Sequence, residues 1–557
     1  MKIFILILFV LLSIISIFGY GKLFESFFLK KKNSVTIGLT GIFGLFLLSI
    51  ISYFTHIFTP HGYLHNSVVF IVGVSTFMFY LKKDLIKINR NHYIIFLLLL
   101  IGIFLAKSHD DFSYYHLPNA LHFVENKLEF GLGNLNHGFK HHSSIFYLYS
   151  IFFLPFIDFY LFNALNFFFL LFSVIYLFDS IKVDIREKAF DNISLIKIIF
   201  LILFVSLFNR IGEYGTDITG QLLAGVLICF TFEQIYRSRI NKNNLLIVLS
   251  MITYLITIKT YFIVYVSFFF FLIFLMDKEK VLKEIFFSKL FLFVNIVGVL
   301  FILINISATG CIIYPVSKLC FPNYFSWGLQ IETVNYLSNW YEIWSKAGAG
   351  PNFRVEDPLI YIKEFNWVYN WIDKYFFTKV SDFLFSVFVT MLLVLLIFKE
   401  SINFKFRNNV NKNLIFYLLI FLSFIFWFLK FPSLRYGGYI LSISVIIIPF
   451  ASLFNFQKIS YKKISKNFII LFSISILIFI SRNILRIDKE LNYSAVENFK
   501  SFPFFYVKKT NYVEEIINDE KIFKVIGSSC WATPSPCLSN TNKKIERKYT
   551  YRFFLDK

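Results

Sequence analysis

Two adjacent carboxylates, Asp110 and Asp111, follow closely after an apolar stretch that ends near Ala106. Adjacent carboxylates repel each other, so one of them tends to have a raised pKa unless a cation or a hydrogen-bond donor compensates. This arrangement suits a general base or a metal ligand. A solvated pair that only marks the end of an apolar segment is the alternative, but two carboxylates among aromatic residues favour a functional role.

A second acidic pair, Glu213 and Asp217, lies in a short stretch that also contains glycines at 212 and 215. Ionisable residues at membrane depth are costly and are candidates for function. Thr216 and Asp217 could also cap the helix expected from about residue 219, and capping is compatible with a functional role. We therefore treat Glu213 and Asp217 as support for the base or as metal ligands.

Two cations, Lys259 and Arg435, lie in turns where the charge pattern otherwise depletes Lys and Arg. A cation at such a place suggests an anionic ligand, and a lipid phosphate fits because Arg can engage it with two donors. The alternatives are an ion pair with Glu213 or Asp217, or a side chain that simply reaches the interface.

Six of the ten histidines lie between His109 and His142. Histidine is the commonest metal ligand, but these residues lack a recognisable ligand spacing on an evident helix. Polar contacts to a substrate or a lipid headgroup are favoured instead, with Tyr114, His116 and His137 as the candidates.

The composition indicates which class of protein must position these residues. Of 557 residues, 57% are hydrophobic and only 16% charged, and the mean hydropathy is +0.66. These values exclude a soluble enzyme, a disordered chain and a nucleic-acid binder. The excess of 55 Lys and Arg over 34 Asp and Glu gives +21, which in a membrane protein usually means basic cytoplasmic loops.

The apolar runs predict an all-α integral membrane protein with about 14 transmembrane helices. The first run is treated as a span because it lacks a small-residue cleavage site and another apolar run follows closely. The predicted spans are 3–18, 35–57, 66–81, 92–106, 161–178, 194–208, 219–236, 244–258, 261–276, 289–308, 380–398, 413–429, 437–454 and 467–482.

Clusters of Lys and Arg occur in every second loop between these spans, near 22–32, 82–90, 182–188, 237–242, 278–283, 399–412 and 458–466. The positive-inside rule therefore assigns these loops to the cytoplasm and both termini to the outside. Four larger segments then face outward: 107–160, 209–218, 309–379 and the small tail 483–557. The apolar stretch 144–157 is interrupted by Pro155, so we expect an amphipathic juxtamembrane helix there rather than a span.

Four of the five cysteines fall in two close pairs within the outward segments, Cys311 with Cys320 and Cys530 with Cys537. Close pairs in an oxidising compartment predict disulfides. Five of the seven tryptophans lie in 309–379. Interface anchoring is slightly favoured over sugar stacking for them.

Taken together, these features resemble the polytopic glycosyltransferases of the GT-C superfamily, which use polyprenyl-phosphate sugars. In that superfamily an acidic residue or pair begins the first large outer loop and serves as the catalytic base. Asp110 and Asp111 match that position, and the aromatic Tyr114 follows them.

Some GT-C members carry a second acidic motif in the next outer loop, and Gly215-Thr216-Asp217 resembles it with Gly215 in place of the first acid. That first acid often contributes to a metal site in these enzymes. A divalent cation, Mg²⁺ or Mn²⁺, bound by Asp111 and Asp217 is therefore an open alternative to a metal-free site. The resemblance covers roughly 92–276, preceded by a three-span module, 1–91, and followed by the spans of 277–482 and the tail 483–557.

The resemblance implies transfer of a sugar from a polyprenyl-phosphate donor to a hydroxyl of an extracytoplasmic glycan, lipid or protein. Asp110 or Asp111 would be the base, and Lys259 and Arg435 would hold the donor phosphate. The expected location is a bacterial inner membrane with the active site on the outer, periplasmic face. The expected partners are the lipid-linked sugar and membrane lipids, with no nucleic acid.

Other functions remain open. A polysaccharide polymerase or ligase uses similar donors, but such enzymes usually rely on an arginine-rich outer loop, and 309–379 contains Arg354 as its only arginine. A lipid-linked-sugar transporter would show related halves with ionisable residues inside the spans, which the sequence does not. The histidines leave a metal-dependent lipid phosphatase as a further alternative.

Overall fold

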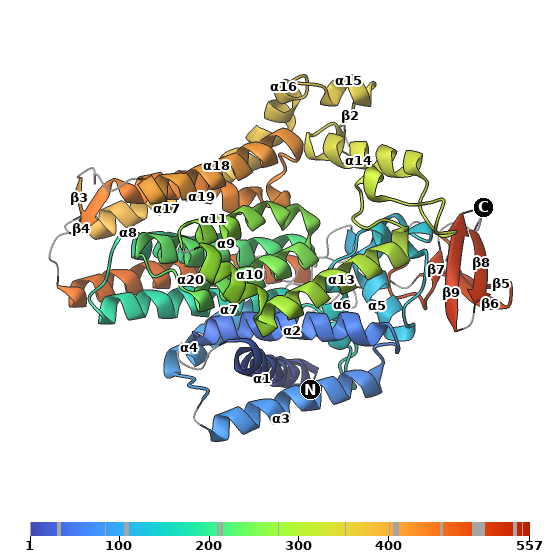
Figure 1. Ribbon diagram of the computed structural model, residues 1–557, viewed down its shortest axis with the longest axis horizontal. Helices are drawn as coiled ribbons and strands as arrows, with labels where there is room; N and C mark the ends of the chain where they lie inside the picture. Colours follow the sequence, from blue (N-terminus) through green and yellow to red (C-terminus); the bar gives the residue numbers. More distant parts are fainter. Residues whose placement is uncertain are drawn as a thin grey trace.

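The computed structural model describes residues 2–29, 35–83, 85–104, 111–208, 211, 215–276, 278–350, 353–399, 402–404, 411–456, 460–492, 507–508, 510–527, 529–538, 543–548 and 550–556. Most of the helices in this part run side by side along the long axis of the molecule, with the C-terminal strands at one end (Figure 1).

Among the described residues, nine helical stretches are long and apolar enough to cross a membrane. They are α1 (Lys2–Phe28), α2 (Ile37–His56), α3 (Tyr63–Lys82), η5 (Phe159–Leu161) with α7 (Ala164–Arg186), α9 (Thr216–Tyr236), α13 (Lys289–Thr309), α16 (Val368–Trp371) with η8 (Ile372–Val380) and α17 (Ser381–Phe398), α18 (Asn411–Lys430) and α20 (Tyr461–Leu491). These helices have the length and composition of a membrane-embedded protein, as the sequence predicts.

The five remaining predicted spans fall on shorter apolar helices of 10–17 residues. They are α4 (Arg90–Leu99) with η1 (Leu100–Phe104), α8 (Asn192–Leu207), α10 (Lys242–Ile258), η6 (Thr260–Tyr265) with α11 (Val266–Phe274), and α19 (Gly438–Ser452). Each predicted span therefore coincides with an apolar helix. Among these helices of the described chain, nine are long enough to cross a bilayer.

The core of the bundle is α7, whose most apolar 18-residue window is entirely buried. It packs against α2, α8 and α9, and a helix that is hydrophobic on all sides must be buried in this way. The outer helix α3 instead has only 17% of its window buried. Its exposed side chains, such as Ile71 and Phe79, are apolar, as expected for a surface that faces lipid.

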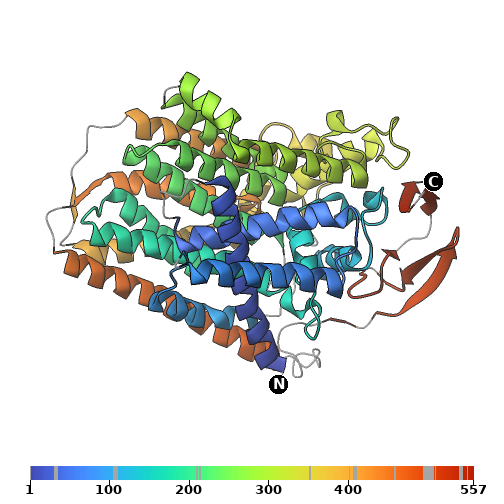
Figure 2. The ribbon, with the colours of Figure 1, turned by 60° about the horizontal axis from the view of Figure 1, so that its bottom comes forward.

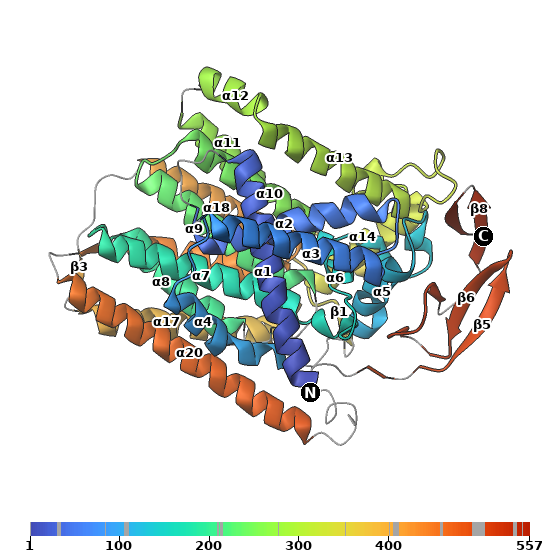
Figure 3. The ribbon, with the colours of Figure 1, turned by 90° about the horizontal axis from the view of Figure 1, so that it is seen from below.

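Helix α1 crosses α2 and α3 at very close range, as Figures 2 and 3 show. A Cβ atom added to Gly19 of α1 would lie 1.9 Å from the backbone oxygen of Gly73 in α3. One added to Gly44 of α2 would lie 2.0 Å from the backbone oxygen of Ile17. Small residues that let backbones approach are typical of helix crossings in membranes, so these glycines fix the N-terminal three-helix unit.

The first large loop folds into short helices at one end of the bundle. They are η2 (Phe112–His116), α5 (Leu117–Glu125), η3 (Leu132–Asn134), η4 (His137–Lys140) and α6 (Ser144–Ile151). All eight residues of α6 are buried. The apolar stretch that was expected to lie on the interface is thus covered by protein, because α2, α5 and α10 pack around it.

The segment after α13 contains η7 (Ser317–Leu319), α14 (Ile331–Ser345), β1 (Ala349–Gly350), β2 (Phe353–Arg354) and α15 (Pro358–Ile362). Cys311 and Cys320 form a disulfide at its start. Trp367 and Trp371 are buried inside the protein, at 0% and 5% exposure. These two rings therefore pack in a protein core rather than anchoring at an interface, because the ring of Phe428 fills the space beside both.

The tail departs from the all-α expectation. It forms an antiparallel pair, β5 (Tyr512–Ile517) with β6 (Glu520–Val525), a short parallel neighbour, β7 (Cys537–Leu538), and a second antiparallel pair, β8 (Lys543–Lys548) with β9 (Tyr551–Asp556). At the opposite end of the bundle, β3 (Ile402–Phe404) pairs with β4 (Phe454–Phe456), and α12 (Lys278–Phe286) links α11 to α13. The strand β8 is mostly charged, so a search for apolar runs passes over it.

The tail packs directly on the first large loop. The backbone N–H of Phe130 donates to Arg552 O at 2.9 Å, and the N–H of Phe554 donates to Phe130 O at 2.9 Å. The rings of Phe130 and Phe553 stack at 4.7 Å. Phe130 therefore acts as an extra strand residue beside β9, and the last strand of the described chain is attached to the loop that follows Asp111.

Candidate functional site

Four charged residues from four separate segments meet at the end of the bundle. Arg435 donates from Nε to Oδ2 of Asp217 at 2.8 Å and from Nη2 to Oδ2 of Asp111 at 3.2 Å. The ammonium of Lys259 lies 2.5 Å from Oδ1 of Asp217. We call these residues the charged cluster; the structure thus brings together both cations and one carboxylate from each acidic pair.

Each member of the cluster stands at the end of a helix. Asp217 lies in the first turn of α9, and Lys259 directly follows the last residue of α10. These positions are favourable because a helix N-terminus attracts negative charge and a C-terminus attracts positive charge. Arg435 lies in η10 (Leu434–Tyr436), just before α19. Gly437 follows with φ of +92°, a conformation that favours glycine and turns the chain sharply into α19.

The cluster is half-buried, with side-chain exposures of 20% for Asp217, 23% for Lys259 and 28% for both Arg435 and Asp111. Burial lowers the pKa of Arg435, but Asp217 and, to a smaller extent, the neighbouring tyrosines and Asp111 together hold that pKa well above its ordinary value. Burial also lowers the pKa of Lys259, and Asp217 offsets this only in part. Arg435 is therefore the permanent cation, whereas the charge of Lys259 depends on its anionic neighbours.

Aromatic rings cover the two cations. The ammonium of Lys259 lies 4.1 Å from the ring centre of Tyr436. The guanidinium of Arg435 lies 5.1 Å from the ring centre of Trp344 in α14 and 5.5 Å from that of Tyr436. Cation–π contacts of this kind stabilise a charge without pairing it, so donor groups of both cations stay available to an anion.

Three hydrogen-bonding side chains, Tyr314, Tyr341 and His137, form a chain of their own. Tyr314 Oη lies 2.9 Å from Tyr341 Oη, which lies 3.3 Å from Nε2 of His137. Burial lowers the pKa of His137 to about 4, with Lys140 contributing and Asp111 opposing. The His137 ring is therefore neutral at neutral pH, and its contact with a substrate stays a prediction.

The other two residues predicted to contact substrate differ in accessibility. Tyr114 is half-buried, and its carbonyl accepts from Nδ2 of Asn136 at 3.1 Å. His116 is buried, with its ring 4.4 Å from that of Tyr115. A Cβ atom added to Gly215 would lie 3.4 Å from Cε1 of His116. His116 therefore packs the first loop against the start of α9, a positioning role rather than an exposed contact.

Asp110 and Glu213 lie outside the described residues. Among the described residues, no group of three or more His, Cys, Asp and Glu side chains is arranged to hold a metal ion. Asp111 and Asp217 both face Arg435, and Asp217 also faces Lys259. Both carboxylates thus bind cationic side chains, and a requirement for Mg²⁺ or Mn²⁺ stays a prediction.

The tail covers the segment that carries Asp111. The backbone N–H of Trp531 donates to Ser113 O at 3.0 Å, and the Trp531 ring contacts Phe112 with ring centres 6.0 Å apart. Cys530 and Cys537, on either side of this contact, form a disulfide. The N–H of Ser535 donates to a carboxylate oxygen of Glu125 at 2.7 Å.

Sequence reasoning missed the aromatic part of the site. Tyr436 follows Arg435 directly in the sequence, so the Arg-Tyr pair itself was a signal. Trp344 belongs to the tryptophan-rich segment for which interface anchoring was favoured, and no local pattern ties it to Arg435. The cations themselves bind Asp217, which is the ion-pair alternative considered for them beside phosphate binding.

The comparisons with known proteins give a family without a described activity. A family model described as "Domain of unknown function (DUF8201)" matches residues 1–442. No curated protein and no solved structure matches the chain. Because the family model covers well over half of the sequence, from α1 through the charged cluster into α19, this chain belongs to the DUF8201 family.

Proposed function

We propose that the protein is a membrane glycosyltransferase that transfers a sugar from a polyprenyl-phosphate donor to a hydroxyl of an extracytoplasmic acceptor. The observation that carries the proposal is the charged cluster: a carboxylate on the first loop, Asp111, shares Arg435 with the Asp217–Lys259 pair. A base and two cations within one half-buried site are the groups that such a transfer needs.

Arg435 and Lys259 each have more N–H donors than their contacts with the two carboxylates use. Arg435 uses Nε and Nη2 for the two carboxylates, and a guanidinium has five N–H donors. Lys259 uses one of its three for Asp217. The remaining donors can take the oxygens of a phosphodiester, and the bidentate geometry of Arg suits that task.

The proposed step is a displacement at the anomeric carbon. The acceptor oxygen forms a bond to that carbon, and the bond from the carbon to the phosphate oxygen breaks. The acceptor proton passes to the carboxylate of Asp111 or of its neighbour Asp110. The leaving polyprenyl phosphate gains one negative charge, which Arg435 and Lys259 stabilise more strongly than they stabilise the donor.

The aromatic rings provide a surface on which the sugar can bind. Trp344 and Tyr436 lie over the cations, and aromatic faces have the apolar surface on which sugar rings stack. Tyr341 and His137 add neutral hydrogen-bonding groups on the Asp111 side. This combination supports a carbohydrate substrate over a simple phosphate ester.

The topology completes the proposal. In this proposal the bundle spans a bacterial inner membrane, and the charged cluster, the first loop and the tail lie on its outer, periplasmic face. The alternation of basic and non-basic loops supports this orientation. The donor's lipid chain then lies among the helices while its sugar reaches Asp111.

The test separates donor binding from transfer. The full chain is reconstituted in lipid nanodiscs, and binding of polyprenyl phosphate is measured by native mass spectrometry. A panel of polyprenyl-phosphate sugars is then supplied with envelope extract as acceptor, and released polyprenyl phosphate is quantified. Asp111→Asn is expected to retain binding and lose release, whereas Arg435→Gln is expected to lose binding by about tenfold or more.

The matched control is Asp373→Asn, which alters an exposed carboxylate whose ion pair among the described residues is with Lys374, and it should leave both readouts unchanged. Binding without release from every donor in the panel, by the unaltered protein, would contradict transferase activity. Movement of the intact lipid-linked sugar across a vesicle membrane would instead identify a transporter. Release that requires a diphosphate-linked donor would identify a polymerase or ligase.

A further inference from the structure

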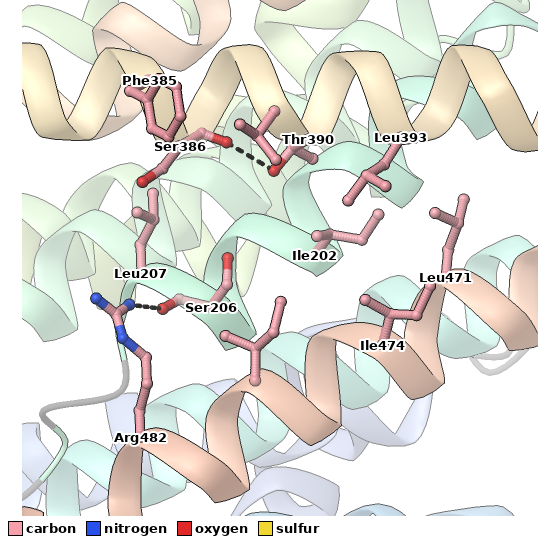
Figure 4. A pocket seen from close by; sticks show the side chains of 12 residues that line it. Ile202, Ser206, Leu207, Phe385, Ser386, Thr390, Leu393, Leu471, Ile474 and Arg482 are labelled. Atoms are coloured by element: carbon pink, nitrogen blue, oxygen red, sulfur yellow. Dashed lines mark hydrogen bonds between the residues drawn. The ribbon is translucent and has the colours of Figure 1, made fainter. Parts of the chain in front are cut away.

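A groove on the side of the bundle lies between α8, α17 and α20 (Figure 4). Its volume is about 240 Å³, and its twelve lining residues include none of the charged cluster. Most of its wall is aliphatic, with Ile202 from α8, Leu393 from α17 and Leu471 from α20. The groove is therefore distinct from the charged cluster and has a different chemistry.

The interior of the groove is suited to an apolar ligand. Its hydroxyl groups on α17 are satisfied within the helix: Ser386 donates to Asp382 O at 2.9 Å, and Thr390 donates to Ser386 O at 2.9 Å. The surface beside it is apolar and open, with Phe385 exposed by 68% and Leu392 by 44%. An apolar groove that opens on an apolar surface of a membrane protein faces lipid chains.

One end of the groove carries a single cation. Arg482 of α20 is exposed, and its Nη1 donates to the backbone oxygen of Ser206 at 2.9 Å (Figure 4). Within the described part of the chain, Arg482 forms no ion pair with a carboxylate, although Asp382 lies on the neighbouring helix one turn before Ser386. A guanidinium beside lipid is costly unless an anion or water neutralises it.

The cation lies at headgroup depth. Ser206 and Leu207 are the last two residues of α8, and Asp217 follows Leu207 by only ten residues in the sequence. The Arg482 end of the groove is therefore the end that carries the charged cluster. The rings of Phe208 and Phe383 pack on Tyr439 with centres 5.9 and 5.0 Å apart. Phe208 and Phe383 are close in sequence to the groove residues Leu207 and Phe385, whereas Tyr439 lies four residues after Arg435.

We propose that this groove binds one anionic glycerophospholipid, with an acyl chain between α8, α17 and α20 and its phosphodiester on Arg482. One guanidinium with free donors matches the single negative charge of a phosphodiester headgroup, and the apolar wall matches a chain. The site lies beyond the proposed glycosyl transfer. Neither Lys259 nor Arg435 lines the groove, which argues against the donor lipid as its occupant.

The experiment uses the full chain, delipidated by detergent exchange and titrated with phosphatidylglycerol, phosphatidylcholine or polyprenyl phosphate, with bound lipid counted by native mass spectrometry. The unaltered protein is expected to retain one phosphatidylglycerol in preference to phosphatidylcholine. Arg482→Gln should weaken that preference by about tenfold. The control Lys489→Gln removes an exposed cation two turns further along the same helix and should have no effect.

A second pair of variants tests the chain position without altering charge. Leu393→Trp fills the groove and should reduce phosphatidylglycerol retention, whereas Leu392→Trp alters the neighbouring exposed residue, which does not line the groove, and should not. Equal retention by Arg482→Gln and the unaltered protein would overturn the proposal. Displacement of phosphatidylglycerol by equimolar polyprenyl phosphate in an Arg482-dependent manner would also overturn it and would place the donor lipid in the groove.

Discussion

Arg435 and Asp217 are separated by 218 residues in the sequence, and Nε of the first lies 2.8 Å from Oδ2 of the second. The same guanidinium reaches Asp111, 324 residues away. Because the fork of Arg435 joins the first loop to the start of α9, its shape and its charge both matter. The two properties can be separated by substitution.

Arg435→Lys keeps the charge but removes the fork, so we expect the link between Asp217 and Asp111 to be lost. Polyprenyl-phosphate affinity should fall by about tenfold, because one bidentate contact is replaced by a point charge. Native mass spectrometry measures this, with Arg354→Lys as the control, since Arg354 is exposed in the segment after α13. Unchanged affinity would show that Arg435 supplies charge alone.

The Asp217–Lys259 contact should appear as an energetic coupling. Removing either partner leaves the other charge half-buried, so Asp217→Asn and Lys259→Gln should each destabilise the protein, and the double variant should be less destabilised than their sum. A coupling free energy of about 0.5–3 kcal/mol is expected from chemical unfolding in mixed micelles. Strict additivity would mean that the two groups do not interact in solution.

The folded protein should become less stable as the pH falls, because His142, which lies just before α6, is largely buried in its neutral form. Burial lowers the pKa of His142 to about 4, whereas an unfolded histidine titrates near 6.5. Between these values the unfolded chain binds the proton and the folded chain does not, so stability is full above about pH 6.5 and decreases as the pH falls toward 4.

The expected decrease is about 1 kcal/mol between pH 7 and pH 5 for His142, after allowance for its partial exposure. His142→Phe, which cannot titrate, should flatten the dependence of the melting temperature on pH by that amount. Melting curves at several pH values measure this. A slope that is identical in the variant and the unaltered protein would show that His142 is already protonated when folded, or not buried.

The disulfide of the tail should stabilise the loop that carries Asp111. In the variant with Cys530→Ser and Cys537→Ser, the turn that places the Trp531 N–H on Ser113 O is no longer closed. Hydrogen exchange over residues 111–125 should then accelerate by about tenfold. The matched control removes the Cys311–Cys320 bond, which lies in a different loop. Equal exchange in both variants would mean that the tail does not support this segment.

The 14 apolar helices could be predicted because each is an apolar run, and such a run indicates burial in lipid or protein without reference to any other part of the chain. Asp111, Asp217, Lys259 and Arg435 could be singled out for the same reason: a charge at the end of an apolar run is a local anomaly. That these residues bind one another followed only from placing them on one face of the membrane.

The aromatic neighbours could not be predicted, because their role depends on contacts between distant segments. Trp344 belongs to α14, and only the fold places it over Arg435. The burial of α6 has the same cause: its sequence is that of an interfacial helix, and the surrounding helices, which no local pattern specifies, cover it.

The pairing of Phe130 with the strand that contains Phe554 has a consequence for how the protein is made. Residues of the first loop leave the ribosome more than 400 positions before their partners in β9 do. The loop beside Asp111 therefore stays incompletely packed until β9 has been synthesised. A polypeptide interrupted before β9 would keep its helices but would lack these contacts, so biogenesis itself delays completion of the site.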